Sequence, residues 1–188
     1  MKMLPCDDAS LEVAAEVLLS GGVAVIPTDT VYGLAAHPAH PSAVERLYTI
    51  KGRAAQKPIA LLAADVTAVR SFLGGELPPG AEDLAARHWP GALTLVLPKG
   101  VIYEGLRVPG HEWTRRLLAR CGGVLRVTSA NLSGCRPATD APAALADVGL
   151  SADLVLDDGI SPGGVPSTVV RIDSSGTLSV LRQGAIVP

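Results

Sequence analysis

Apolar residues follow two kinds of pattern along this chain, one typical of helices and one typical of strands. In residues 9–19 they recur at helical spacing, with polar residues before the stretch and two glycines after it. Residues 23–26 form a short continuous apolar run, which is typical of a buried strand. The same patterns predict helices over 9–19, from 41 onward, and over 65–73, 80–88, 111–120 and 141–147. They predict strands over 23–27, 59–63, 92–97, 123–128, 153–156, 167–172 and 178–182.

Helices and strands alternate in the first part of the chain, and its end is rich in strands. This order predicts an α/β fold with one open, mixed sheet and helices packed on it. A length of 188 residues, 48% of them apolar, suits one domain with its own core. No internal repeat or linker divides the sequence, so we expect a single domain over residues 1–188.

Charge and aromatic content limit the classes of partner. The net charge is about −2, which argues against a protein that coats nucleic acid non-specifically. One Phe, two Trp and three Tyr offer little material for stacking bases. Residues 99–136 nevertheless carry more basic than acidic side chains, so a local basic surface stays open as an alternative.

The cysteines and the N-terminal sequence bear on the cellular compartment. Cys6, Cys121 and Cys135 form no CxxC pair and have no histidine at ligand spacing, so we interpret them as reduced, structural thiols. The first ten residues lack the apolar region of a signal peptide, and no apolar run reaches membrane-spanning length. We therefore expect a cytoplasmic protein without a membrane partner.

The first polar cluster follows the strand over 23–27. Proline cannot donate to a sheet ladder, so the strand should end near Pro27. Thr28, Asp29 and Thr30 come directly after it, and Gly33 allows the backbone to turn or to approach a ligand closely. Polar residues at a strand end are a common way to build a binding site in an α/β sheet. An ordinary strand end and turn is the alternative.

A second cluster is cationic. Lys51, Arg53 and Lys57 lie on one connection with no acidic residue between them, which suits a polyphosphate ligand. A solvated basic loop is the alternative interpretation. Neither a P-loop nor a dinucleotide-binding glycine motif occurs in the sequence.

Five further polar positions are candidates for a site. Arg107 can grip a carboxylate with two parallel hydrogen bonds, or it can form a surface ion pair. Ser129 and Asn131, at the end of the strand over 123–128, can bind a phosphate, a ribose or an amide, or can cap a helix. Ser167 and Arg182, taken alone, are compatible with ordinary strands and turns.

Read together, these stretches resemble the YrdC-like family of threonylcarbamoyl-AMP synthases. The resemblance rests on segments in the family's order: PTDTVYGL (27–34), KGRAAQKP (51–58), WPGALT (89–94), RVP (107–109), SANLSG (129–134), VPSTVV (165–170) and LRQGAI (181–186). Ala54 and Ala92 stand where the family usually has proline. Relatives often have a proline before SANLSG, where this chain has residues 124–126, which leaves the role of Arg126 open. We interpret WPGALT as structural.

The resemblance implies a single-domain YrdC-like fold in its short bacterial form, without an additional C-terminal domain. It implies a nucleotidyltransferase that converts L-threonine, bicarbonate and ATP into L-threonylcarbamoyl-AMP, pyrophosphate and water. A downstream threonylcarbamoyl transferase complex would then complete the t6A modification of tRNAs that read ANN codons. Contact with tRNA is compatible with this reaction but not required by it.

The resemblance also implies residue roles. The threonine-binding residues would be Thr30, Arg107 and Ser167. The ATP-binding residues would be Lys51, Arg53, Lys57, Ser129, Asn131 and Arg182. Lys51 and Arg53 would also be catalytic, Mg²⁺ would be carried by the ATP phosphates, and the protein would supply no metal site. The alternatives are an RNA-binding module, a paralogue with another activity such as the YciO-like branch, and a carbamoyl-transfer domain of a hydrogenase-maturation protein.

Overall fold

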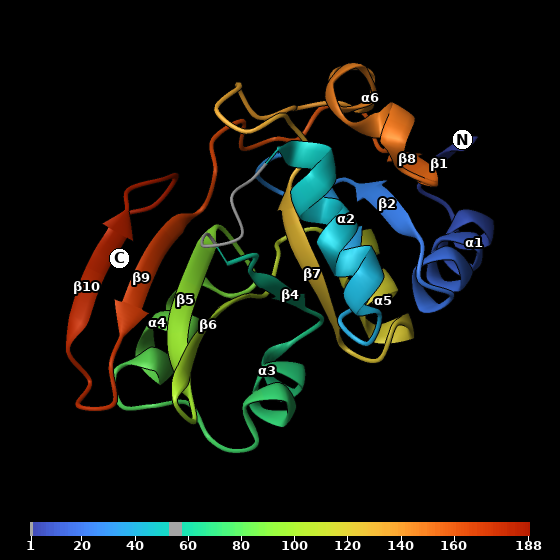
Figure 1. The fold of residues 1–188 in the computed structure, drawn as a ribbon. Helices are drawn as coiled ribbons and strands as arrows, with labels where there is room; N and C mark the ends of the chain where they lie inside the picture. Colours follow the sequence, from blue (N-terminus) through green and yellow to red (C-terminus); the bar gives the residue numbers. More distant parts are fainter. Residues whose placement is uncertain (1, 53–57) are drawn as a thin grey trace.

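The computed structural model describes residues 2–52 and 58–188, and these residues form one mixed sheet with helices around it (Figure 1). The sheet order is β1-β8-β2-β3-β7-β4-β6-β5-β9-β10, with parallel and antiparallel pairs interspersed. The strands are β1 (Lys2–Pro5), β2 (Val23–Ile26), β3 (Gly33–Ala36), β4 (Leu61–Ala63), β5 (Leu93–Lys99), β6 (Ile102–Arg107), β7 (Val124–Ser129), β8 (Leu154–Asp157), β9 (Thr168–Ile172) and β10 (Leu178–Arg182).

The helices match the predicted ones in number and place within the described residues. They are α1 (Asp8–Leu19), α2 (Pro41–Lys51), α3 (Val66–Leu73), α4 (Ala81–His88), α5 (Glu112–Arg120) and α6 (Ala141–Asp147), followed by a 3-10 turn (Gly149–Ser151). The predicted strands are also confirmed, and β2 ends directly before Pro27 as expected. The predicted α/β class with an open, mixed sheet is correct.

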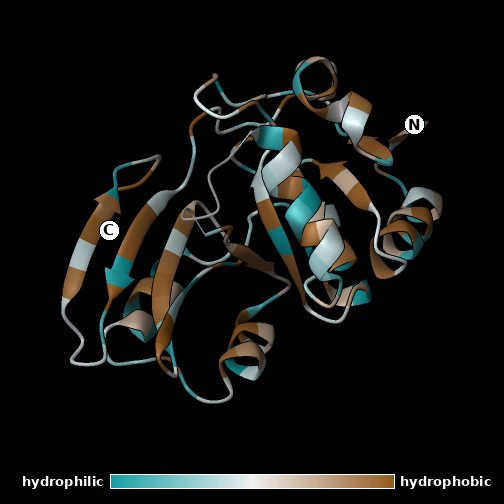
Figure 2. Cartoon of the chain, in the orientation of Figure 1, coloured by the Kyte–Doolittle hydropathy of each residue, from teal (hydrophilic) through white to brown (hydrophobic). Residues whose placement is uncertain are grey.

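The half of the sheet around β2 is covered on both faces. Ala24 and Ile26 pack into a cluster with α1 and α5, whereas Val23 and Val25 pack into a second cluster with α2 and α6. Successive side chains of a strand point to opposite faces, so a strand covered on both sides needs apolar residues throughout. This explains the continuous apolar run at 23–26, which is brown along its length in Figure 2.

The other half of the sheet is covered by helices on one face. Leu93, Leu95 and Leu97 of β5 are buried in a third cluster with α3 and α4. Thr94 and Val96, which alternate with them, line a cavity on the opposite side. The alternation within β5 therefore separates a core face from a face that is available to a ligand.

Three strands, β1, β3 and β6, were not predicted. Strand β1 is short and mostly exposed, so it lacks the apolar pattern of the other strands. Strand β3 begins at Gly33, where we expected a turn or an approach to a ligand. Gly33 pairs with Ile26 on one side and Ser129 on the other, and an added Cβ would lie 2.5 Å from Cγ1 of Val127. The glycine therefore lets β7 come close to β3, and the turn precedes it.

The structure also bears on membrane-spanning segments and on the cysteines. No helix in the described part of the chain is long and apolar enough to cross a membrane. All three cysteines are free. Burial, together with nearby aspartates, raises the pKa of Cys6 to about 12, and burial raises the pKa of Cys121 to about 11, so both are thiols at neutral pH. Cys135 is exposed.

Candidate functional site

A cavity of about 610 Å³ gathers the polar segments that are scattered along the sequence. Its walls come from the turn before β3, the entry to β4, the facing sides of β5 and β6, the end of β7, and β9 with β10. Among the candidate residues, the cavity is lined by Thr30, Arg107, Ser129, Asn131, Ser167 and Arg182. Six predicted site residues from five separate segments therefore share one cavity.

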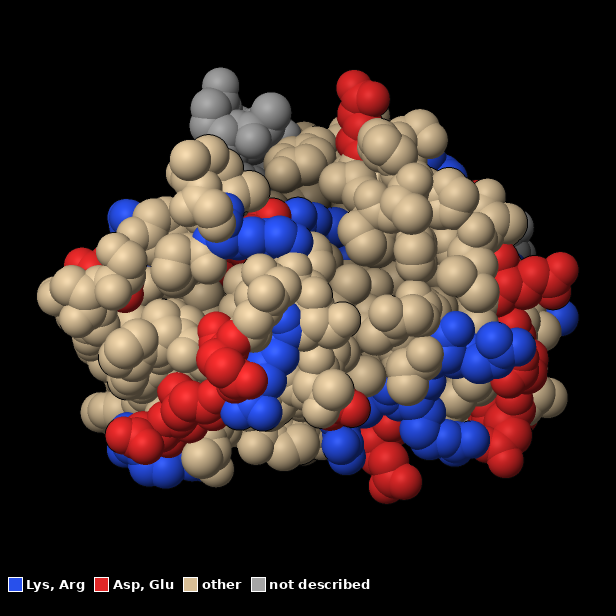
Figure 3. Space-filling model, turned by 90° about the horizontal axis from the view of Figure 1, so that it is seen from below, with Lys and Arg blue, Asp and Glu red and all other residues tan. Residues whose placement is uncertain are grey.

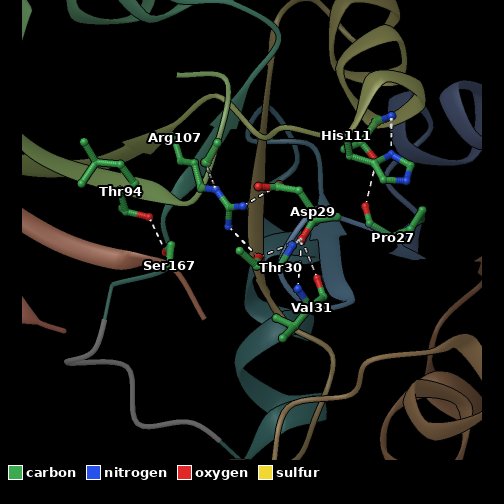
Figure 4. A network of polar contacts seen from close by, with 12 residues as sticks. Pro27, Asp29, Thr30, Val31, Thr94, Arg107, His111 and Ser167 are labelled. Carbon is green, nitrogen blue, oxygen red and sulfur yellow. Dashed lines mark hydrogen bonds and ion pairs between the residues drawn. The ribbon is translucent and has the colours of Figure 1, made fainter. Parts of the chain in front are cut away.

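The turn between β2 and β3 is folded by the hydroxyl of Thr28. Its Oγ1 donates to the carbonyl oxygen of Val31 at 2.6 Å and accepts the backbone N–H groups of Thr30 and Val31 at 3.2 and 3.3 Å. Such local hydrogen bonds replace a sheet ladder directly after a strand. The turn places Thr30 on the cavity wall, facing Arg107 (Figure 4).

Arg107, at the end of β6, is a fixed cation at the cavity wall. Its Nε donates to the carbonyl oxygen of Gly91 at 2.8 Å, and its Nη1 donates to Oγ1 of Thr30 at 2.8 Å. Its Nη2 forms an ion pair with Oδ1 of Asp29 at 2.5 Å. Burial lowers the pKa of Arg107 and Asp29 opposes this shift, but a guanidinium keeps its charge at neutral pH.

Ser167 lines the cavity just before β9, the strand that pairs with β5. Its hydroxyl is 2.8 Å from that of Thr94 on β5, and both side chains are buried. Arg182, at the end of β10, donates from Nε and Nη2 to the carbonyl oxygen of Ser167 at 3.1 and 2.8 Å. These contacts bring a hydroxyl and a second guanidinium to the same wall (Figure 4 shows Thr94 and Ser167).

The SANLSG segment forms a turn at the end of β7, and no helix begins there, so the helix-cap alternative is wrong. The side-chain amide of Asn131 donates to the carbonyl oxygens of Leu132 and Cys135, both at 2.8 Å. Lys51 is buried beneath this turn and donates from Nζ to the carbonyl oxygens of Ser129 and Asn131 at 2.5 and 2.6 Å. Lys51 therefore supports the turn from α2 and is not part of the cavity lining that the structure describes.

The other predicted cations are not all placed. Arg53 and Lys57 lie outside the described residues. Arg126, whose role was open, forms an ion pair with Glu104 at 2.7 Å and donates to the carbonyl oxygen of Ile59 at 2.8 Å. It ties β7 to β6 and to the entry of β4, which is a structural role.

Two residues of this region had no predicted role. Asp29 belongs to the PTDT segment, but no partner for it was visible before Arg107 was placed beside it. Thr94 lies in WPGALT, which we interpreted as structural. That interpretation fits Trp89, which is buried and donates from Nε1 to the carbonyl oxygen of Leu93 at 2.7 Å. The signal for Thr94 was its polar side chain at an alternating position of an otherwise apolar strand.

Acidic and metal-binding side chains are not concentrated in the cavity. No group of three or more His, Cys, Asp or Glu residues able to hold a metal ion occurs in residues 2–52 and 58–188. Hydroxyl groups, an amide and guanidinium groups dominate the polar lining. Such a set suits a small ligand that carries carboxylate or phosphate groups.

The mixed ten-stranded sheet and its polar cavity define an α/β protein with a site for a small anionic ligand. The Sua5/YciO/YrdC family model, described as telomere recombination, matches residues 16–184, and the chain belongs to this family. The predicted resemblance is thereby confirmed.

Relatives and solved structures agree with this assignment. The chain is 36% identical to threonylcarbamoyl-AMP synthase of Pyrococcus abyssi, in an alignment that covers 88% of this chain and 52% of that protein. It is 34% identical to threonylcarbamoyl-AMP synthase of Bacillus subtilis, in an alignment that covers 97% of this chain and 56% of that protein. It therefore spans about half the length of these curated relatives. P. abyssi Sua5 complexed with L-threonine superposes with a TM-score of 0.90 at 31% identity, covering 98% of this chain and 58% of that one. E. coli YciO, at 24% identity and a TM-score of 0.84 over 97% and 93%, shows the fold alone.

Proposed function

We propose that this protein is a threonylcarbamoyl-AMP synthase, a nucleotidyltransferase that joins L-threonine, bicarbonate and ATP and releases pyrophosphate. The observation that carries the proposal is the cavity itself, which has a buried guanidinium on one wall and a hydroxyl–amide turn on another. Two anionic substrates repel each other, so a site that aligns them needs cations or hydrogen-bond donors for each on separate parts of the cavity. The names of the similar P. abyssi and B. subtilis proteins point to the same reaction.

Threonine is assigned to the wall formed by Thr30, Arg107 and Ser167. The guanidinium of Arg107 is held by three protein contacts and retains further N–H donors for a carboxylate. The hydroxyl groups of Thr30 and Ser167 lie on the same cavity and can contact the rest of the amino acid. The P. abyssi Sua5 structure contains L-threonine, and it superposes on nearly the whole chain.

ATP is assigned to Ser129 and Asn131 at the SANLSG turn and to Arg182, which lies beside Ser167. Arg53 and Lys57 complete this set in the proposal. Lys51 contributes its charge from beneath the SANLSG turn, where its ammonium stabilises the carbonyl groups that shape the turn. In this proposal Lys51 stabilises the turn that carries Ser129 and Asn131, in addition to the catalytic role proposed for it with Arg53.

The chemistry requires positioning and electrostatic stabilisation. The threonine amine and bicarbonate form a carbamate with loss of water, a carbamate oxygen attacks the α-phosphorus of ATP, and the bond to pyrophosphate breaks. The protein aligns the two reactants and stabilises the charge that grows on the leaving pyrophosphate. Mg²⁺ bound to the ATP phosphates would neutralise part of that charge. The ion would reach the site with its substrate, since Mg²⁺ is commonly bound through substrate phosphates.

The proposal extends to the cellular role. The adenylate product would pass to a threonylcarbamoyl transferase complex for the t6A modification of tRNA, in the cytoplasm, and the whole chain would act as one YrdC-like domain. Similarity to relatives along most of the chain supports this extension.

Pyrophosphate release tests the proposal directly. The protein is incubated with ATP, L-threonine and bicarbonate, and each component is omitted in turn. We expect release only with all three present, and we expect Arg107→Ala to abolish it while Arg116→Ala, on an exposed ion pair, leaves it unchanged. Release that ignores threonine would indicate another acceptor, and ATP binding without release would favour a paralogue with a different activity.

A further inference from the structure

Asp29 contacts the key cation of the site but does not line the cavity. Its Oδ1 pairs with Nη2 of Arg107 at 2.5 Å, and its side chain is 16% exposed. The neighbouring residues Thr28 and Thr30 belong to the cavity wall, whereas Asp29 is absent from the lining within the described residues. Asp29 can therefore influence the orientation of a ligand through its contact with Arg107 (Figure 4).

Two glycines from distant segments enclose Asp29. An added Cβ at Gly110 would lie 3.2 Å from both Cγ and Oδ2 of Asp29. An added Cβ at Gly163 would lie 2.6 Å from the backbone oxygen of Asp29, and the N–H of Gly163 donates to that oxygen at 3.1 Å. Gly110 thus lies against the carboxylate of Asp29 and Gly163 against its backbone, and both glycines come this close because they lack a side chain.

The physical need for this carboxylate follows from the burial of Arg107, which is 5% exposed. A buried cation is stable only when it is paired and hydrogen-bonded. Thr30 and Gly91 provide neutral acceptors, so among these three contacts of Arg107 it is Asp29 that supplies the compensating charge. With Nε and one N–H of each terminal nitrogen engaged, the plane of the guanidinium is fixed before a ligand arrives.

We propose that Asp29 is a positioning residue that orients Arg107 for the carboxylate of the amino-acid substrate. This inference rests on the proposed function of the cavity. Pre-organisation of Arg107 lowers the ordering cost of binding, and it determines which N–H donors face the cavity. The negative charge of Asp29 also disfavours a ligand carboxylate nearby, so the inference requires that orientation outweighs this repulsion.

Binding of L-threonine and of L-threoninol, which lacks the carboxylate, to the full-length chain separates these effects. In Asp29→Ala we expect L-threonine to bind at least about tenfold more weakly, since a charge-assisted hydrogen bond to a fixed guanidinium is lost or misdirected. Binding of L-threoninol and the KM for ATP should stay within about twofold of wild type. Asp8→Ala is the matched control, because it breaks an ion pair of 2.6 Å on the exposed surface, and it should change none of these values.

Two further variants keep the test valid if Asp29→Ala does not fold. Asp29→Asn removes the charge and keeps the shape, and Gly110→Ala displaces the carboxylate while keeping the charge. Both should weaken L-threonine binding in the same direction, Gly110→Ala less than Asp29→Asn.

The outcomes are distinguishable. Unchanged or tighter L-threonine binding in folded Asp29 variants, with a wild type that binds L-threonine, would overturn the inference alone. A wild type that neither binds L-threonine nor needs it for pyrophosphate release would overturn the proposed function and this inference together.

Discussion

Buried hydroxyl groups around the cavity depend on partners from other elements for their orientation. Oγ1 of Thr30 lies 3.0 Å from that of Thr28 and accepts from Arg107, while Oγ of Ser167 contacts Thr94. A hydroxyl rotates freely unless its partners fix it, and a buried one that loses its partner carries the cost of desolvation. At the scale of single residues, Thr28 and Thr94 therefore matter for ligand binding, because they orient the hydroxyl groups of Thr30 and Ser167.

Thr94→Val tests this dependence, because it removes the hydroxyl and nearly keeps the shape of the side chain. Ser167 then loses its 2.8 Å contact with Thr94, while Nη2 of Arg182 still donates to its hydroxyl at 3.3 Å. We expect the KM for L-threonine to rise by about five- to tenfold, as for one lost hydrogen bond. The KM for ATP should remain unchanged in the same steady-state assay. Thr49→Val, whose exposed hydroxyl contacts only its own helix, is the control. An equal rise in both KM values would indicate a general packing defect.

At the scale of elements, close approach of strands shapes the cavity floor. Strand β3 lies between β2 and β7. Its first residue, Gly33, pairs with both neighbouring strands and lines the cavity. The 2.5 Å separation between a hypothetical Cβ of Gly33 and Cγ1 of Val127 leaves no room for alanine without movement. The packing of the Val127 side chain against β3 therefore requires a residue without a side chain at position 33.

Gly33→Ala should reduce the free energy of unfolding by about 1–3 kcal/mol, as overpacking of a filled core does. Chemical denaturation followed by circular dichroism measures the change. Adding Val127→Ala to the same chain should make room for the new methyl group, so the double variant should lose less than the sum of the two single variants.

Gly75→Ala is the matched control for this pair, because nothing lies within 4 Å of its added Cβ. Its stability should stay close to that of wild type. Additive losses in the double variant would contradict the steric explanation.

At the scale of the whole molecule, charges that look unbalanced in the sequence are paired in space. Arginines between residues 99 and 136 meet acidic partners in the pairs Arg107–Asp29, Arg116–Asp8, Arg120–Glu12 and Arg126–Glu104, and in the first three pairs the acidic residue comes from the N-terminal part of the chain. Figure 3 shows basic and acidic side chains lying beside each other on the face seen from below. These pairs reduce the local basic surface that the sequence left open.

This pairing predicts weak, non-specific affinity for tRNA. We expect a dissociation constant no tighter than about 10⁻⁶ M at physiological salt, and a shallow dependence of binding on salt concentration. Filter binding over a salt series measures both, and pyrophosphate release should not change when tRNA is added. Nanomolar binding with a steep salt dependence would instead support the RNA-binding alternative.

Much of the fold was predictable because local patterns determine local structure. Helical and alternating spacing located every helix and most strands, and Pro27 marked the end of β2. Strand β3 was missed because Gly33 has low strand propensity, and its role depends on Val127 in another strand. The motifs pointed to Thr30, Arg107 and Ser167, which line the cavity, but not to their partners Asp29 and Thr94.

The sequence by itself determined the elements and the kinds of polar groups, since periodicity and side-chain chemistry are properties of neighbouring residues. Only the tertiary structure decided which groups meet. Arg107 and Asp29 are 78 positions apart, and Thr94 and Ser167 are 73 apart. Their contacts depend on the order β6-β5-β9 and on the turn before β3, which bring separate strand ends to one cavity. Non-local strand pairing of this kind leaves no local pattern in the sequence.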